Sequence, residues 1–144
     1  MVERLTAPTP EELDRLTELW EASVVATHTF LDAADIPYFR RIVRTEALPA
    51  AELYVVRDGG EWRAFAGIGG DKLEMLFVAP HSRGKGVGRT LVEHLVRERG
   101  IRRVDVNEQN AQAVGFYRRL GFRPVSRDER DPSGRPYPIL HLER

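Results

Sequence analysis

Residues 76–92, LFVAPHSRGKGVGRTLV, place a glycine-rich, basic segment between an apolar run and a helical pattern. Its centre reads Arg83, Gly84, Lys85, Gly86, Val87, Gly88 and Arg89. Successive backbone N–H groups of such a turn can point into one concavity, and the positive end of the following helix dipole also attracts an anion. Glycine lets an anion approach the backbone, and basic side chains at the rim add charge-assisted hydrogen bonds. The stretch therefore predicts a phosphate-binding loop between a strand and a helix.

Spacing disfavours two other phosphate-binding loops. A Walker A loop needs Gly-Lys followed by Ser or Thr, and this tripeptide does not occur here. The dinucleotide fingerprint needs G-x-G-x-x-G directly after a strand, whereas this strand ends near Val78 and the glycines stand at alternate positions. Asp105 lies about 20 residues further on, where the fingerprint places an acidic residue, so a nicotinamide-dinucleotide module stays as a distant alternative.

Length and composition limit the class of protein. The 144 residues predict a single domain over 1–144. The 22 basic and 22 acidic side chains cancel, which argues against a nucleic-acid binder or a protein of anionic membrane surfaces. The chain contains no cysteine, so disulfides, a thiolate nucleophile and cysteine-based zinc sites are excluded. Without a long apolar run or a signal peptide, we expect a cytoplasmic protein.

Hydrophobic periodicity predicts alternating strands and helices. Strands are expected at 3–7, on both sides of the Asp58-Gly59-Gly60 turn within 52–70, at 72–78, at 102–107 and on both sides of the Pro132-Ser133-Gly134 turn. Helices are expected at 10–30, at 36–48, at 86–99 and from 111 to a stop at Gly121. The run at 72–78 is apolar on both faces, which favours a central strand. This order predicts an α/β fold with a mixed sheet.

Capping signals refine the first two helices. Thr9 is expected to cap the first helix, with Pro10 at its first position and Glu12 completing a capping box. The second helix is expected to have Asp35 as its cap and Pro49 beyond its end.

Two segments resemble the GNAT N-acetyltransferase superfamily. The glycine stretch is similar to that family's acetyl-CoA loop, R/Q-x-x-G-x-G/A after a strand ending V-x-P, and Arg83, Gly86 and Gly88 match it. The segment VNEQNAQAVGFYRRLGF, residues 106–122, resembles the family's N-x-x-N-x-x-A-x-x-F-Y-x-x-x-G-F. The two motifs in this order are far more specific than either alone. WEASVVATHTF and GRPYPILHL also look like a small bacterial single-domain subgroup.

The resemblance implies a fold and a cosubstrate. The expected GNAT fold has a twisted mixed sheet of about six to seven strands and about four flanking helices. The expected reaction moves an acetyl group directly from acetyl-CoA to a primary amine. In this family the backbone of Leu76, Phe77 and Val78 would pair with pantetheine, and the amides from Arg83 to Arg89 would hold the pyrophosphate. Asn110 would contact the pantetheine arm or the start of a helix.

Tyr117 has two readings. On spacing alone, an aromatic side chain in a helix packs in the core, as Phe116 and Phe122 are expected to do. Within the family's motif, Tyr117 would sit near the sulfur of the cosubstrate. A phenol with a pKa near 10 can protonate a leaving thiolate whose thiol has a pKa of about 8.5. The resemblance therefore implies that Tyr117 is the general acid.

The acceptor amine must also lose a proton, because an ammonium group has no lone pair. Glu74 is the first candidate, since a period of 2 would put it on the same face of the strand as Leu76 and Val78; a solvent-facing or structural ion pair is the other interpretation. His28 is the second, because histidine exchanges protons near neutral pH, although it could also cap or pack. Asn107 is expected to orient the acceptor or a water molecule.

The acceptor itself stays open. The resemblance implies a site between about 22–40 and 126–138, and a polyamine, aminoglycoside, amino acid, peptide N-terminus or protein lysine would all suit the chemistry. Asp128, Glu129 and Asp131 would attract a cationic amine or form a solvated loop.

No metal is expected, because His81, His94 and His141 lack the spacing of metal ligands. We expect a monomer or homodimer with no nucleic-acid or membrane partner. The alternative to an acetyltransferase, from a different class of function, is a non-catalytic acyl-CoA-binding or sensing domain. Tyr117 and Glu74 favour the enzyme.

Overall fold

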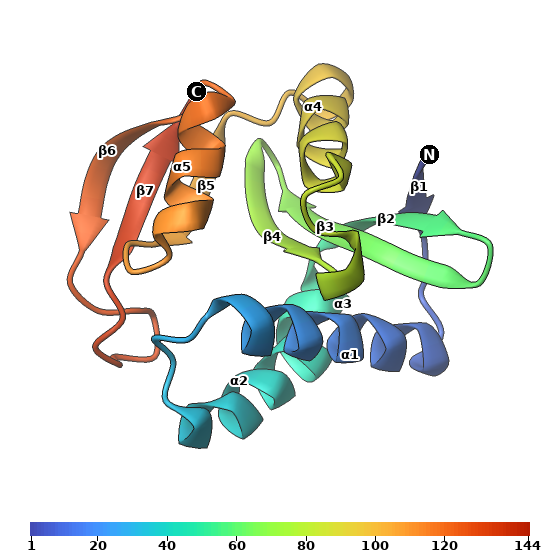
Figure 1. The fold of residues 1–144 in the computed structure, drawn as a ribbon, viewed down its shortest axis with the longest axis horizontal. Helices are drawn as coiled ribbons and strands as arrows, with labels where there is room; N and C mark the ends of the chain where they lie inside the picture. Colours follow the sequence, from blue (N-terminus) through green and yellow to red (C-terminus); the bar gives the residue numbers. More distant parts are fainter.

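Strands and helices alternate along the computed structural model, which describes residues 1–144 (Figure 1). The strands are β1 (Val2–Leu5), β2 (Glu52–Asp58), β3 (Glu61–Gly69), β4 (Lys72–Val78), β5 (Arg103–Asn107), β6 (Arg123–Asp128) and β7 (Ile139–Glu143). The helices are α1 (Pro10–Thr27), α2 (Ile36–Ile42), α3 (Leu48–Ala50), α4 (Val87–Arg99) and α5 (Ala111–Arg119), with a π turn at Val43–Ala47 and 3₁₀ turns at Ala33–Asp35 and Pro80–Ser82. None of the helices combines the length and apolar character needed to cross a bilayer.

All seven strands belong to one sheet, in the order β1-β2-β3-β4-β5-β7-β6. Neighbouring strands are antiparallel except β4 and β5, which are parallel. The predicted mixed sheet is therefore confirmed, and β4 lies in its middle, as the apolar sequence of 72–78 indicates. The last strand in the chain, β7, lies between β5 and β6.

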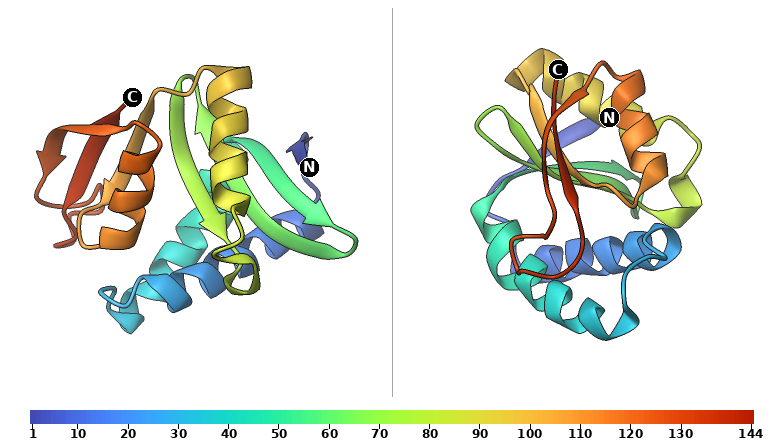
Figure 2. Two further views of the ribbon diagram at one scale, coloured as in Figure 1. Left: turned by 45° about the horizontal axis from the view of Figure 1, so that its top comes forward. Right: turned by 90° about the vertical axis from the view of Figure 1, so that its left-hand side faces the viewer.

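Helices cover both faces of the sheet, as Figure 2 shows. α4 and α5 lie on one face, over a core in which Leu91, Leu95 and Phe122 are fully buried. α1 and the helical segment 36–50 lie on the other face, where Leu16 and Phe65 are fully buried. Each of these side chains contributes about 1.5–3 kcal/mol by burial. The structure confirms the α/β fold with four flanking helical segments.

The start of α1 confirms the predicted capping box. Thr9 Oγ1 accepts the amide of Glu12 at 3.1 Å, and Glu12 Oε1 accepts the amide of Thr9 at 2.9 Å. The helix ends at Thr27, before the predicted end at Phe30, because His28 leaves the helical region with φ −101° and ψ 58°. The first strand also ends early, at Leu5, and the positive φ of 46° at Ala7 keeps the backbone from staying extended.

The second predicted helix runs further than expected. α2, the π turn at Val43–Ala47 and α3 follow one another without a break, so Pro49 lies inside the last turn and not beyond it. Proline has no N–H to donate, and its ring crowds the preceding turn of a helix. The wider π turn directly before Pro49 is where the helix accommodates that ring.

A clasp of five residues joins the β6–β7 loop to the start of α2, and it replaces the cap predicted at Asp35. Tyr137 donates its hydroxyl to Asp35 at 2.7 Å and accepts the amide of Asp32 at 3.1 Å. Arg135 pairs with Asp35 at 3.1 Å and lies over the ring of Tyr38, 3.8 Å from its centroid. The hydrogen bonds from Tyr137 and Arg135 hold the pKa of the Asp35 carboxyl below its usual range. The side chain of Asp35 is therefore used in this clasp and does not cap α2.

His141, on β7, cross-links the last three strands in the sheet order, β5, β7 and β6. Its Nδ1 lies 2.6 Å from Asp105 on β5, and its Nε2 lies 2.8 Å from Asp128 on β6. The bonds to Asp128 and Asp105 raise the pKa of the imidazole, because only the protonated ring donates to both carboxylates. Burial opposes ionisation of Asp105, but hydrogen bonds from Lys72, at 2.6 Å, and His141 outweigh it and lower the pKa of the carboxyl.

We predict that His141→Gln destabilises the protein more at pH 6 than at pH 9. A histidine whose pKa is raised in the folded state gives its full stabilisation below its unfolded-state pKa of 6.5, and this is lost as the pH rises through the folded-state pKa. Urea denaturation of both proteins at the two pH values gives the difference in free energy of unfolding, which should fall by about half or more at the higher pH. A difference that stays constant or grows with pH would show that the charged imidazole does not cross-link the strands.

Candidate active site

β4 and β5 separate after their first two residue pairs. Their register contains only Lys72 with Arg103 and Leu73 with Val104, and beyond these the strands diverge (Figure 1). On its other edge β4 stays paired with β3 as far as Val78. The backbone groups of 76–78 that point toward β5 therefore have no strand partner, although backbone N–H and C=O groups require one.

A cleft of about 440 Å³ opens at this gap. Its twenty lining residues come from the end of α1, from β4 and the glycine loop, and from α5: Ser23, Thr27, His28, Leu76, Phe77, Val78, Ser82, Arg83, Gly84, Gly86, Val87, Gly88, Arg89, Asn110, Gln112, Ala113, Phe116, Tyr117, Arg119 and Leu120. Every residue predicted to bind the cofactor lines this cleft except Lys85. Of the four predicted catalytic residues, Tyr117 and His28 line it, and Glu74 and Asn107 do not.

The glycines of the loop serve two different purposes. Gly84 and Gly86 have φ angles of 74° and 77°, a left-handed conformation that glycine adopts without strain. Nothing lies within 4 Å of a Cβ added at either position, so glycine is needed there for the backbone conformation. At Gly88 an added Cβ would lie 3.3 Å from Val78 and 3.6 Å from Phe116. Glycine at this position lets α4 approach β4 closely.

The first turn of α4 is open to an anion. The amides of the first turn of a helix have no partner within the helix. Thr9 and Asn110 satisfy one such amide in α1 and α5, but the cap of α4 is Gly86, which has no side chain to do so. The amides at 87–89 therefore point from the positive end of the helix dipole into the cleft, where Arg83 and Arg89 also line the wall.

Tyr117 belongs to both the core and the cleft. The residue is 6% exposed, and its ring packs edge-on against Phe116 and Phe122. Its hydroxyl makes no hydrogen bond within the protein. Every polar side-chain atom that is fully enclosed in the molecule has a hydrogen-bond partner, so this hydroxyl is not fully enclosed. The hydroxyl must therefore open onto the cleft. Burial raises the pKa of Tyr117, so the phenol stays protonated well above neutral pH.

Comparison with known proteins agrees with this geometry. Residues 49–124 match the family described as Acetyltransferase (GNAT) domain. The chain is 42% identical over 133 residues to the peptidyl-lysine N-acetyltransferase YjaB of Salmonella typhimurium, covering 92% of this chain and 91% of that protein.

The chain belongs to the GNAT acetyltransferases.

Solved structures place it in the same fold. The solution structure of apo-form YjaB from Escherichia coli superposes with a TM-score of 0.87 at 40% identity, over 99% of this chain and 95% of that one. The acetyltransferase yncA of Salmonella typhimurium, solved with acetyl-CoA, shares the fold at a TM-score of 0.64 and 18% identity, over 100% and 92% of the two chains. The chain is thus an acetyl-CoA-dependent N-acetyltransferase, as the two motifs predict, and nothing in these comparisons favours the non-catalytic alternative.

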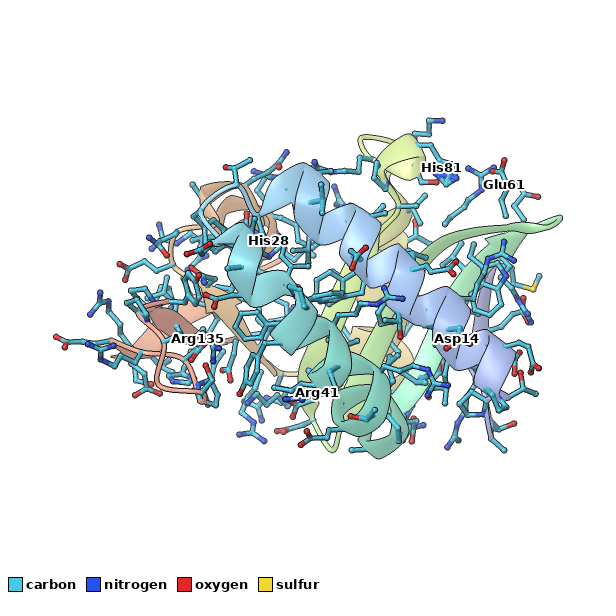
Figure 3. All side chains as sticks on the ribbon, turned by 90° about the horizontal axis from the view of Figure 1, so that it is seen from below. Asp14, His28, Arg41, Glu61, His81 and Arg135 are labelled. Atoms are coloured by element: carbon cyan, nitrogen blue, oxygen red, sulfur yellow. The ribbon has the colours of Figure 1, made fainter.

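His28 connects α1 to α5 across the GNAT cleft (Figure 3 shows it at the end of α1). Thr27 donates its hydroxyl proton to the carbonyl of Ser23 at 2.7 Å, so it accepts from Nδ1–H of His28 at 2.7 Å. This tautomer leaves Nε2 to accept from Nδ2 of Asn110 at 3.4 Å, while Oδ1 of Asn110 accepts the amide of Ala113 at 3.1 Å. Burial and the nearby charge of Arg83 lower the pKa of His28 to about 4, so the ring is neutral at pH 7.

The prediction that Glu74 shares a face with Leu76 and Val78 is wrong. The register of β3 and β4 pairs Gly67 with Met75 but Ile68 with Leu73, which leaves Glu74 unpaired in a β-bulge. A bulge breaks the period of 2 that the prediction assumed. The carboxyl of Glu74 instead lies on the face of the sheet covered by α1. It is 3.4 Å from the position that a Cβ would take at Gly69, and 3.9 Å from Nζ of Lys72. It is outside the cleft.

Asn107 and Lys85 also lie outside the cleft. Oδ1 of Asn107 accepts the amide of Gln109 at 2.9 Å, and its carbonyl accepts the amide of Asn110 at 3.0 Å. The side chain thus shapes the turn that leads into α5. Lys85 stands between two left-handed glycines of the loop and is exposed. No group of three or more His, Cys, Asp or Glu residues is placed to hold a metal ion.

Sequence reasoning missed eight lining residues: Ser23, Thr27, Ser82, Gln112, Ala113, Phe116, Arg119 and Leu120. Those on α5 recur on the helix face that carries Asn110 and Tyr117, so helical spacing could have found them. Ser82 lies within the loop stretch itself. Ser23 and Thr27 gave no signal, because only the packing of α1 beside the gap brings them to the cleft.

We predict that Gly86→Asp weakens acetyl-CoA binding about 100-fold or more, because it adds a carboxylate beside the amides that face the anion. Asp and Asn tolerate left-handed φ better than other residues, and the space around Gly86 is empty, so the fold should remain intact. Calorimetric titration with acetyl-CoA measures the effect.

Gly86→Asn is the matched control for this prediction, since it has the same size without the charge. It should lose much less affinity than Gly86→Asp. Equal affinities for wild type and Gly86→Asp would exclude this loop as the anion site.

Proposed function

We propose that this enzyme acetylates lysine side chains of proteins or peptides, with Tyr117 as the general acid. One observation carries the proposal: a single cleft contains the open amides of α4, the unpaired edge of β4 and the hydroxyl of Tyr117. The transfer needs all three: an anion-binding site for the pyrophosphate, a free backbone edge to pair with pantetheine, and a proton donor.

The cleft orients acetyl-CoA along one direction. Its pyrophosphate is proposed to bind the amides between Arg83 and Arg89, where the helix dipole and the arginines favour negative charge. The amide groups of the pantetheine arm would pair with the free backbone of 76–78, as a strand would. This places the thioester deeper in the gap, toward Tyr117 on α5.

The charge of the cleft argues against a small polycationic acceptor. Three arginines line it, and none of its residues is Asp or Glu. A polyamine or an aminoglycoside would need carboxylates to replace the solvation of its several ammonium groups. A lysine brings only one ammonium group, and the rest of its protein stays outside. The peptidyl-lysine activity named for YjaB, at 42% identity, supports the same choice.

Tyr117 can donate a proton at the moment the carbon–sulfur bond breaks. The amine nitrogen forms a bond to the acetyl carbon, the electron pair of the broken bond goes to sulfur, and the phenol protonates that thiolate. The nitrogen, positively charged after the attack, releases its second proton to solvent as the amide forms, and the phenolate regains a proton from solvent. Because burial raises the pKa of Tyr117, its proton stays in place until a strongly basic neighbour appears.

The ammonium group of lysine must first lose a proton, and we assign its removal to Glu74 through water. Glu74 lies on the face covered by α1, and its side chain is 44% exposed, so water reaches it. His28 is the weaker candidate for the base. An imidazole with a pKa of about 4 is a weak base, and its Nε2 already accepts a hydrogen bond from Asn110. We assign His28 and Asn107 positioning roles.

The experiment uses two peptides: one with a single lysine and a blocked N-terminus, and one with a free N-terminus and no lysine. Thiol release from acetyl-CoA should require the lysine. Tyr117→Phe should lower kcat about 10-fold or more, since general acids contribute about 10²–10⁴-fold. Its melting temperature and acetyl-CoA affinity should barely change, because the ring still packs.

Preference for the free N-terminus would overturn the choice of acceptor. Full kcat in Tyr117→Phe, with chemistry limiting, would make Tyr117 a core residue only. Tight acetyl-CoA binding without thiol release for any amine would contradict the transfer itself.

We predict that Glu74→Gln lowers kcat/KM for the lysine peptide at pH 7 more than His28→Gln does, by about 5-fold or more. His28→Gln should act mainly by raising KM for acetyl-CoA, because it loosens the link between α1 and α5. Steady-state rates over a range of pH measure both variants. A larger loss of kcat/KM in His28→Gln would reverse these assignments.

A further inference from the structure

A second hollow, of about 340 Å³, lies between α4, α5 and the C-terminal residue. Its lining residues are Arg89, Val92, Glu93, Val96, Arg97, Arg119, Leu120 and Arg144. Three of them, Arg89, Arg119 and Leu120, also line the acetyl-CoA cleft, so the two hollows adjoin. Figures 1 and 2 show α4 and α5 on the same side of the sheet.

This hollow, which we call the arginine hollow, concentrates positive charge in a chain with no net charge. Four arginines and one carboxylate line it. Glu93 pairs with Arg89 at 2.6 Å, Arg97 pairs with Glu98 at 3.4 Å, and Arg144 donates to the carbonyl of Leu120 at 3.0 Å.

Arg119 has no hydrogen-bond or ion-pair partner, although it borders both hollows. Helix dipoles account for Arg97 and Arg119, which lie in the last turns of α4 and α5. They do not account for Arg89, in the first turn of α4, or for Arg144, outside any helix. Like charges gathered around one hollow repel each other, and an anion between them would remove that cost.

The cosubstrate carries a second anionic group. Besides its pyrophosphate, acetyl-CoA has a 3′-phosphate on the ribose, and a phosphate monoester carries about −1.5 to −2 charges at pH 7. The ribose follows the pyrophosphate directly, so with the pyrophosphate at the glycine loop its phosphate would lie close to the first turn of α4. Arg89 stands on that turn and faces both hollows.

We propose that the arginine hollow binds the 3′-phosphate of coenzyme A, with Arg119 and Arg144 as its main ligands. This rests on the proposed seating of the pyrophosphate in the glycine loop. A guanidinium group donates two parallel hydrogen bonds to a phosphate, which makes arginine better suited than lysine to this role. The hollow would then distinguish coenzyme A from nucleotide thioesters that lack the 3′-phosphate.

Calorimetry with acetyl-CoA and with acetyl-3′-dephospho-CoA tests the proposal. Wild type should bind acetyl-CoA about 10-fold or more tightly, a difference of about 1.4 kcal/mol. Arg144→Gln should lower the affinity for acetyl-CoA and leave that for the dephospho form unchanged. Arg119→Gln, at a residue that also lines the acetyl-CoA cleft, should lower the affinity for acetyl-CoA more than that for the dephospho form. Arg118→Gln is the matched control, because Arg118 is exposed on the same helix and lines neither hollow, and it should keep the full preference.

Three results would overturn the proposal. Equal affinity of wild type for both ligands would show that the hollow does not bind the 3′-phosphate, while leaving the acetyl-CoA cleft in place. An equal loss for both ligands in Arg119→Gln and Arg144→Gln, with unchanged melting temperature, would show that these arginines act on another part of the ligand. Failure of wild type to bind either ligand would reject the cleft itself, and with it this subsite.

Discussion

The parallel pairing of β4 with β5 ends after two residue pairs, and the rest of the active site depends on this. The bulge at Glu74 lies directly after the second pair. A bulge bends its strand and increases the local twist, so it accounts for the divergence of β4 from β5 at this point. The divergence leaves a free backbone edge on β4 and room for the cleft beside α5. The bulge also determines which face of the sheet Glu74 serves.

Charge is distributed unevenly over this neutral molecule. Arginines border the acetyl-CoA cleft and the arginine hollow, whereas Glu74, Asp105 and Asp128 lie outside both. Positive charge thus gathers on the side where a phosphate-rich cosubstrate is proposed to bind. A net charge of zero argues against general binding to nucleic acids, but it says nothing of local fields, which depend on where the side chains gather.

Most of the fold could be predicted from the sequence, because local signals specify it. The capping box at Thr9, the apolar run at 72–78 and the left-handed glycines of the loop all depend on neighbours within a few residues. The role of Asp35 in the clasp could not be predicted, because its partner Tyr137 is about a hundred positions away in the sequence.

The part of the candidate site that lies within the two sequence motifs could also be predicted. The glycine loop and Tyr117 lie within short motifs, so their residues were found. Glu74 was assigned to the wrong face of the sheet, because the alternation of side chains along a strand does not reveal where a β-bulge interrupts it. The arginine hollow combines two helices and the last residue of the chain, a proximity that only the packed structure reveals.

The position of β7 between β5 and β6 has a consequence for synthesis on the ribosome. β6 pairs only with β7, and β5 pairs with β7 along its whole length but with β4 at only two positions. While residues 139–143 are untranslated, a nascent chain has both sequence motifs but lacks the strand that joins β5 to β6. Its unpaired edges are open to pairing with other chains during that interval. The wall of the cleft that α5 forms therefore becomes fixed only when the last of the seven strands has left the ribosome.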